Sequence, residues 1–159
     1  PFSSILVCMI DFFISFFLFL ILFIVFKGAP SWQIVFLPLV ICYGLIFSFS
    51  LGLLFATASV KYRDVKFILP FIIQILFYAS PVFLTTTFVL ELNIPEIFKI
   101  IYQLNPLVFI LNAFKYCLYG SFDHYEPTYV LIGFLITFCL LTGSIKYFLN
   151  FEKSFADYI

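Results

Sequence analysis

Four stretches of predominantly apolar residues constrain this chain of 159 residues more than any other feature. They lie at about 5–26, 34–58, 67–89 and 129–149. A helix rises about 1.5 Å per residue, so about 20 apolar residues cross the roughly 30 Å of hydrocarbon in a bilayer. Each stretch is long enough, and each therefore predicts a transmembrane helix.

The composition supports the same class of fold. Hydrophobic residues make up 65% of the chain and charged residues only 10%, and the formal net charge is zero. A soluble domain has about a quarter of its residues charged, and this chain has a mean hydropathy of +1.21. We expect an all-α polytopic membrane protein in a lipid bilayer, with no basic patch and no nucleic-acid partner.

A further apolar segment, at about 97–119, differs from the four spans. It is interrupted by polar residues and a proline, namely Gln103, Asn105, Pro106, Asn112 and Lys115. Because Pro106 breaks a continuous helix, and because irregular backbone is not tolerated against lipid, we expect a broken re-entrant helical hairpin before the last span. A fifth full span is the alternative.

Basic residues indicate which side of the membrane each loop occupies. Lys61, Arg63 and Lys66 share the short loop at about 59–66, which the positive-inside rule places in the cytoplasm. With four spans, the tail at about 150–159 returns to the same side. A fifth span would place that tail outside.

Asp11 is the only carboxylate well inside an apolar run. A charge at the bilayer centre costs about 2.5–3.5 kcal/mol on insertion scales, so an intramembrane charge is a candidate for proton or ion coupling. The alternative is that Asp11 lies close enough to one membrane surface to reach headgroups or a basic group.

Enzymatic chemistry has little support in the sequence. His124 stands in the polar stretch 122–126 without a second good metal ligand at suitable spacing, which favours a solvated loop. No phosphate-binding loop of the form G-x-x-x-x-G-K-[ST] is present. We expect no catalytic, cofactor or metal site in this chain. The cysteines are scattered and are expected to be small buried hydrophobes, at Cys8, Cys42, Cys117 and Cys139.

Aromatic side chains are abundant, with 26 Phe and 10 Tyr. Most of the phenylalanines are explained by contact with lipid or with other helices. The tyrosines at positions where a hydroxyl favours a hydrated surface are candidates for stacking on sugar rings, at Tyr78, Tyr102, Tyr116 and Tyr119.

Several short motifs carry a family resemblance when they are taken in order. They are residues 60–65 (VKYRDV), 80–82 (SPV), 104–107 (LNPL), 113–115 (AFK) and 151–159 (FEKSFADYI). The series resembles the permease subunit of bacterial ABC-type polysaccharide exporters, which move O-antigen, capsular polysaccharide and teichoic acid. The resemblance covers essentially the whole chain. Two departures are Lys115, where the family often has Arg, and residues 85–87 (TTT), where an aromatic-proline pair is common.

The resemblance implies that residues 1–159 are the C-terminal part of one six-span exporter domain, with earlier spans upstream. It implies a homodimer in the bacterial cytoplasmic membrane that is bound to two ATP-binding subunits. ATP and Mg²⁺ would belong to those subunits, the substrate would be a polyprenyl-linked polysaccharide, and the segment at about 92–122 would form the outer gate.

Two groups of residues become candidate functional sites under this resemblance. The loop residues are candidates for contact with the ATP-binding subunit or, alternatively, for topological anchoring: Lys61, Tyr62, Arg63, Asp64 and Lys66. The gate and bend candidates are Ser80, Pro81, Asn105, Pro106 and Lys115.

Two other classes of protein compete with this interpretation. An ion-coupled secondary transporter or channel would use Asp11 and the break at Asn105 and Pro106 as a site near the membrane midplane. A membrane-embedded enzyme acting on lipid-linked sugars would need acids, bases or metal ligands that the sequence does not group together.

Overall fold

The computed structural model describes residues 2–62, 64–82, 85–120 and 127–156. Within these residues the chain forms only helices, and no strand is present. In chain order they are α1 (Phe2–Lys27), η1, a 3-10 helix (Trp32–Phe36), α2 (Leu37–Lys61), α3 (Val65–Tyr78), α4 (Thr86–Glu91), α5 (Glu96–Gln103), α6 (Pro106–Tyr119) and α7 (Pro127–Ala156). The expected all-α fold is confirmed.

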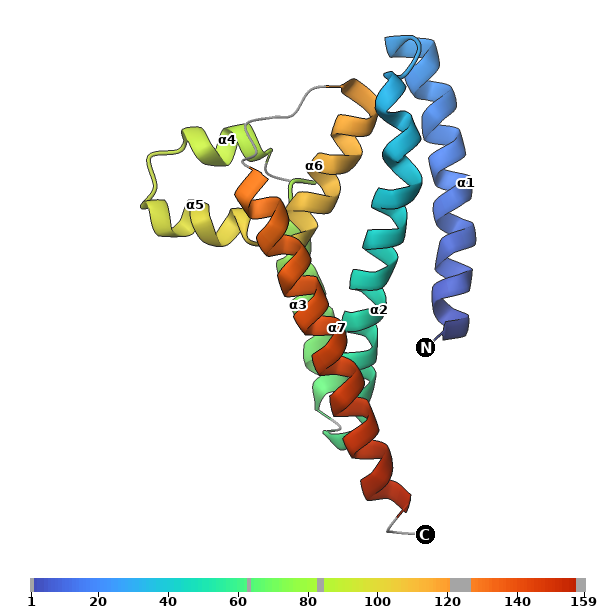
Figure 1. Ribbon diagram of the computed structural model, residues 1–159, viewed down its shortest axis with the longest axis vertical. Helices are drawn as coiled ribbons and strands as arrows, with labels where there is room; N and C mark the ends of the chain where they lie inside the picture. Colours follow the sequence, from blue (N-terminus) through green and yellow to red (C-terminus); the bar gives the residue numbers. More distant parts are fainter. Residues whose placement is uncertain (1, 63, 83–84, 121–126, 157–159) are drawn as a thin grey trace.

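Three helical stretches in the described part of the chain are long and apolar enough to cross a membrane. They are Leu6–Lys27 in α1, Trp32–Lys61 across η1 and α2, and Thr128–Glu152 in α7. Figure 1 shows α1 and α2 side by side and α7 crossing α2. The α2–α3 connection and the end of α7 lie at one end of the molecule, which we call the loop end. The α1–η1 connection and the end of α6 lie at the other, which we call the junction end.

The stretch at 67–89 does not form the single helix that the sequence predicts. Helix α3 ends at Tyr78, and α4 begins only at Thr86. The hydroxyl of Ser80 donates to the carbonyl of Phe77 at 2.7 Å, and Pro81 has no N–H with which to continue the helix. At 14 residues, α3 is only about 21 Å long, which is less than the roughly 30 Å of hydrocarbon.

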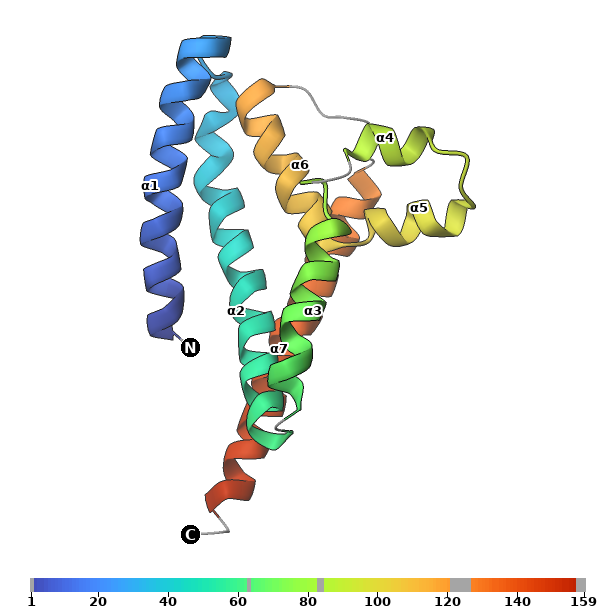
Figure 2. The same ribbon diagram turned by 180° about the vertical axis from the view of Figure 1, so that it is seen from behind.

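Helices α5 and α6 form the bent hairpin expected before the last span. Their axes differ by 69° across a short break. Figures 1 and 2 show α4, α5 and α6 together in the half of the molecule toward the junction end, with α4 and α5 projecting sideways as an arm. The bent pair therefore does not reach the loop end, and by length and composition it is either a broken span or a re-entrant loop.

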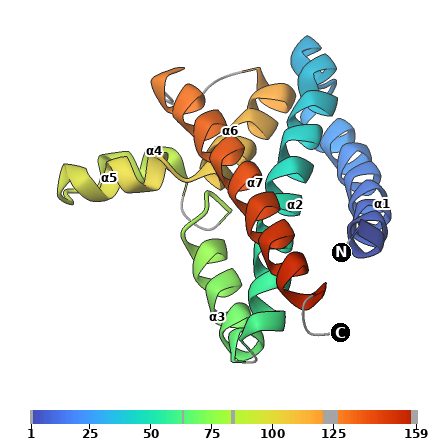
Figure 3. The same ribbon diagram turned by 60° about the horizontal axis from the view of Figure 1, so that its bottom comes forward.

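The core lies where α2 packs against α7 and α6. Its buried residues come from α1, α2 and α6: Phe23, Leu37, Val40, Tyr43, Phe109, Ala113, Cys117 and Leu118. The contact between α2 and α7 is the most extensive in the molecule. Figure 3 shows α7 lying along α2, with the α4–α5 arm on one side and α1 on the other.

Gly120 ends α6 at the junction end. Gly120 follows α6 with φ of +74° and donates its N–H to the Tyr116 carbonyl at 2.9 Å. A Cβ at this position would lie 2.5 Å from Ser31 Oγ. The backbone N–H of Ser31 in turn donates to the Leu118 carbonyl at 3.2 Å. The residue is therefore required both for its left-handed backbone and for the close approach of the α1–η1 connection.

Candidate functional site

A buried pair of polar side chains joins the α4–α5 arm to α6. The Thr86 hydroxyl accepts from Nδ2 of Asn112 at 2.9 Å and lies 3.1 Å from its Oδ1. Both residues are almost fully buried, with exposed fractions of 1% and 3%. A hydrogen bond in such surroundings is costly to break because neither group can turn to water instead.

Tyr102 extends this pair to a third helix. Its side chain also hydrogen-bonds that of Thr86, so that α4, α5 and α6 meet at one threonine. We call Thr86, Tyr102 and Asn112 the polar hub. Because the hub residues come from three helices, and because α4 and α5 bury few other residues, their hydrogen bonds help to specify how the arm sits on α6.

A second contact joins the two helices of the arm, α4 and α5. The Lys99 ammonium of α5 donates to the carbonyl of Leu90, in the last turn of α4, at 2.6 Å. Carbonyls at a helix C-terminus have no partner within the helix and carry partial negative charge, so a cation stabilises them. Lys99 therefore caps α4 and holds the two arm helices together.

The bend between α5 and α6 is built by the two residues that the sequence singled out. Asn105 is the N-cap of α6, and its Oδ1 accepts from the backbone N–H of Leu107 at 3.0 Å. Pro106 occupies the first turn, where the missing N–H has no cost. The pair therefore ends α5 and starts α6 in a new direction.

The other predicted gate residues are separate from the hub hydrogen bonds. Ser80 and Pro81 are buried at the end of α3, on the segment that leads to α4. Lys115 is partly buried on α6, three residues after Asn112. Of the tyrosines proposed to stack on sugars, Tyr102 belongs to the hub, while Tyr119 packs edge-to-face on Phe23 of α1 with ring centroids 5.3 Å apart.

The charged loop lies at the loop end, between α2 and α3. Lys61, Tyr62, Asp64 and Lys66 are all exposed, and the Lys61 ammonium lies 5.1 Å from the centroid of the Tyr62 ring. Arg63 falls outside the described residues. Since the structure records no ion pair that joins Lys61, Asp64 or Lys66 to another described residue, these charges face outward from the fold.

The position of Asp11 along α1 can be compared with the thickness of a bilayer. Asp11 is exposed and stands sixteen residues before Lys27, a helical distance of about 24 Å. If Lys27 marks one boundary of a hydrocarbon layer about 30 Å thick, Asp11 lies within roughly 6 Å of the other. This position fits contact with headgroups better than an ion site at the midplane.

Two further sequence predictions concern metal and thiol chemistry. His124 falls outside the described residues, and within them no group of His, Cys, Asp and Glu is arranged to hold a metal ion. The prediction of buried cysteines is correct for Cys117 and wrong for Cys8, Cys42 and Cys139, which are exposed on apolar helices. A small thiol is tolerated on such a face because the bilayer, rather than the protein, surrounds it.

The sequence reasoning missed Thr86 as a functional candidate. It noted residues 85–87 only as a departure from a pattern, and it noted Asn112 only as an interruption of an apolar run. The available signal was a polar amide in an apolar helix, which in a membrane needs a hydrogen-bond partner. The identity of that partner depends on how the arm folds back.

The helices define a multi-pass α-helical membrane protein with a bent helix pair before its last span. The chain belongs to the ABC-2 type transporter family, whose model matches residues 2–119. The family and the apolar helices make it a multi-pass protein of the inner membrane.

One characterised relative matches the whole chain. This is the O-antigen export system permease protein RfbA of Myxococcus xanthus, which is 24% identical over 160 residues, covering 100% of this chain and 60% of that protein. The chain thus spans about three fifths of the length of this relative. No solved structure gives a significant match.

Proposed function

We propose that this chain is part of a permease subunit that exports a lipid-linked polysaccharide across the bacterial cytoplasmic membrane. The observation that carries the proposal is the similarity along the whole chain to a permease of O-antigen export, within a family of ABC-2 type transporters. The composition supports the proposal, because a chain with so few charged residues fits a role in forming a path through the membrane better than a role in catalysis.

The energy for transport comes from partner subunits in this proposal. ATP and Mg²⁺ bind to two separate ATP-binding subunits, since this sequence has no phosphate-binding loop. Two copies of the permease form a homodimer, and the polyprenyl-linked substrate passes between them. The exposed loop residues Lys61, Tyr62, Asp64 and Lys66 support a partner contact at the loop end, which the positive-inside rule assigns to the cytoplasm.

The structure offers a physical route from that loop to the opposite end. Helix α3 begins directly after the loop, ends at the Ser80 and Pro81 turn, and is followed by α4, which carries Thr86. A shift of α3 caused by the ATP-binding subunits therefore pulls on the polar hub. We propose that the hub is the latch of an outer gate formed by α4, α5 and α6, and that the break at Asn105 and Pro106 is its hinge.

The competing ion-coupled transporter or channel is not favoured. The family is one of ABC-type transporters, and no ion-coupled family is among the matches that carry the proposal. An intramembrane ion site needs several oxygen ligands that converge, whereas Asp11 is exposed on an apolar helix.

The proposal is tested in cells from which the gene has been deleted. Loss of the permease should remove the polysaccharide from the cell surface and leave lipid-linked polysaccharide at the cytoplasmic leaflet, as measured by antibody labelling of intact and permeabilised cells. The wild-type gene should restore surface labelling. Unchanged surface polysaccharide in the deletion strain would contradict the proposal.

A further inference from the structure

Helix α3 carries an exposed amide in an otherwise apolar stretch. Between Lys66 and Tyr78 the only polar side chain of α3 is that of Gln74. Gln74 is exposed, and no hydrogen bond joins its side chain to any other residue that the structure describes. A carboxamide has two N–H donors and an acceptor oxygen, so this group lacks partners within the described chain.

The depth of Gln74 in the bilayer makes the missing partners costly. Lys66 lies in the basic loop that the positive-inside rule assigns to the cytoplasmic side, and Gln74 follows it by eight residues. This is up to about 12 Å of helix, close to half of the roughly 30 Å of hydrocarbon. Lipid tails neither donate nor accept hydrogen bonds. The amide therefore needs a polar partner from outside the described chain.

Gln74 belongs to a stripe on the outer side of α3. Leu69, Ile72 and Leu76 are half-buried, and they face α2, because α2 is the main neighbour of α3. Positions two residues further along a helix lie about 200° away, and the residues shifted by two are exposed. With Phe67 one turn earlier, they form what we call the outer stripe: Phe67, Phe71, Gln74 and Tyr78. Figure 2 shows α3 on the outside of the bundle, in front of α7.

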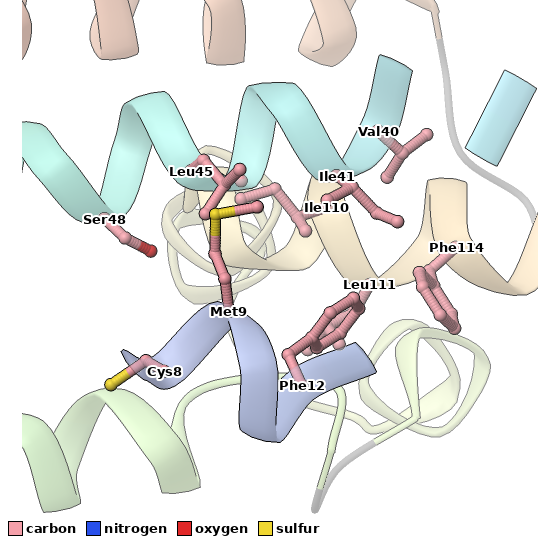
Figure 4. Close-up of a pocket in the computed structure, with 11 residues that line it drawn as sticks. Cys8, Met9, Phe12, Val40, Ile41, Leu45, Ser48, Ile110, Leu111 and Phe114 are labelled. Carbon is pink, nitrogen blue, oxygen red and sulfur yellow. The ribbon is translucent and has the colours of Figure 1, made fainter. Parts of the chain in front are cut away.

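The described helices leave the outer stripe uncovered. Phe67 and Phe71 are 72% and 68% exposed. Figure 4 shows α1 and α6 meeting α2 over its first half, where Val40 and Ser48 line the space between these helices. Helix α3 instead follows the end of α2 and runs back along its second half.

The side chains of the outer stripe suit a helix as their neighbour. Three aromatic rings and one amide are separated by four, three and four residues, which is the spacing at which two helices interlock at a shallow angle. Lipid can cover the rings but leaves the amide unpaired, whereas a helix with a polar group opposite Gln74 satisfies both. One polar residue in such a seam also fixes its register, because any other alignment leaves the polar group without a partner.

A second copy of the chain supplies that polar group in the simplest way. Two copies with the same sidedness are related by a two-fold axis along the membrane normal, so equal positions of α3 can face each other. Because an amide both donates and accepts, Gln74 of each copy can donate to the oxygen of the other. No second kind of polar residue is needed.

We propose that the outer stripe is the interface of α3 with α3 of a second copy, and that the two Gln74 amides hydrogen-bond across the two-fold axis. Hydrogen bonds and close packing drive the association of helices in lipid, where apolar contact alone does not. The rings of Phe71 and Tyr78 pack on either side of the amides. This inference rests on the homodimer of the proposed function and names the surface that forms it.

Disulfide crosslinking in cell membranes tests the interface in the full-length protein without its native cysteines. A disulfide joins Cα atoms no more than about 7 Å apart. Phe71→Cys lies on the outer stripe, and Ile73→Cys, at a position with 57% exposure, lies on another side of α3. Because the substrate is proposed to pass between the copies, oxidation is carried out without ATP. We expect several-fold more disulfide-linked dimer from Phe71→Cys than from Ile73→Cys.

Equal crosslinking of the two variants would overturn the proposal, because it would report random collisions. Phe71→Cys that stays monomeric would overturn it as well, since a helix of the same copy, or the transport path, would then cover the outer stripe. If Phe71→Cys fails to fold, as judged by size-exclusion chromatography, Phe67→Cys is read in the same way.

The role of the amide is tested by a second substitution in the Phe71→Cys protein. Gln74→Leu should lower the yield of crosslinked dimer several-fold, because the hydrogen bonds between the copies are lost. Gln74→Asn keeps a carboxamide and should retain most of the yield. Ile73→Leu is the matched control and should change nothing. Unchanged crosslinking in Gln74→Leu would overturn the proposal.

The crosslinking result and the export result fail independently. Crosslinking needs neither substrate nor ATP, so a protein that exports no polysaccharide can still form the α3 interface. Conversely, export that continues in a strain whose permease does not crosslink at Phe71→Cys would refute this interface and leave the proposed function intact.

Discussion

The hydroxyl of Tyr43 lies 2.6 Å from the hydroxyl of Thr137 and joins α2 to α7 across 94 positions of sequence. Tyr43 also donates to the carbonyl of Gly133 at 2.9 Å. Only 6% of the surface of Tyr43 is exposed. In a bilayer the apolar faces of α2 and α7 are as well solvated by lipid as by each other, so hydrogen bonds and close packing supply the preference for association.

Replacement of Tyr43 by phenylalanine tests this contact. Tyr43→Phe removes the hydroxyl and leaves the buried Thr137 with one partner fewer, so we expect a loss of about 1 kcal/mol in the free energy of unfolding. The measurement is unfolding of the purified protein in mixed micelles by titration with a denaturing detergent.

The matched control is Tyr119→Phe, which keeps the ring contact with Phe23. Tyr119 is 53% exposed, so its hydroxyl has access to solvent and its removal should change stability little. Equal losses in the two variants would show that the Tyr43 hydroxyl has no special role.

The polar hub is tested by a double-mutant cycle between α4 and α6. Thr86→Val leaves the Asn112 amide without Thr86, and Asn112→Leu leaves Thr86 with Tyr102 alone. The double variant removes both groups of the pair, and Tyr102 loses Thr86 equally in the single and the double variant, so the two losses should be less than additive. We expect a coupling energy of about 0.5–1.5 kcal/mol in the free energy of unfolding. Thr85→Val, at an exposed neighbour, serves as the control. Strict additivity would mean that the two side chains do not interact.

Gly120 and Gly28 form a natural pair for testing the junction end. Both have positive φ, at +74° and +91°, but only at Gly120 does an added Cβ collide, with Ser31 Oγ at 2.5 Å. Gly28→Ala should therefore lose roughly 1–2 kcal/mol of stability from backbone strain alone. Gly120→Ala should lose clearly more in the same unfolding measurement. Equal losses would mean that Ser31 moves aside freely.

Sidedness is tested by labelling with a membrane-impermeant thiol reagent in a background without native cysteines. Tyr62→Cys lies at the loop end and Asn93→Cys lies on the arm, and both side chains are exposed. The basic loop should be cytoplasmic, so Asn93→Cys should react in intact cells and Tyr62→Cys only after permeabilisation. The reverse pattern would place the loop outside.

Apolar run length predicts α1, α2 and α7 well, because each run is at least as long as a bilayer requires and no proline stands in the interior of these helices. The same measure fails at α3. Ser80 and Pro81 stand inside the apolar run. The Ser80 hydroxyl bonds the Phe77 carbonyl and Pro81 has no N–H, so the helix ends although the hydropathy continues. Hydropathy records which residues tolerate lipid, not where the backbone turns.

The hairpin was predictable in kind but not in its contacts. Asn105 and Pro106 are adjacent in sequence and carry a local capping signal, so the bend could be located. Thr86 and Asn112 are 26 residues apart, and their meeting depends on the arm, whose path follows from the early end of α3. The contact between Thr86 and Asn112 could not be predicted from the sequence, because it depends on the turn after α3, which the sequence did not predict.

The most direct test of the account is transport by the permease and its ATP-binding subunits in sealed proteoliposomes. Movement of a polyprenyl-linked polysaccharide across the bilayer is measured by its accessibility to a glycan-cleaving enzyme on the far side. We predict movement that requires ATP hydrolysis and is unchanged when ion gradients are collapsed. Movement that persists without the ATP-binding subunits and follows an ion gradient would contradict the account.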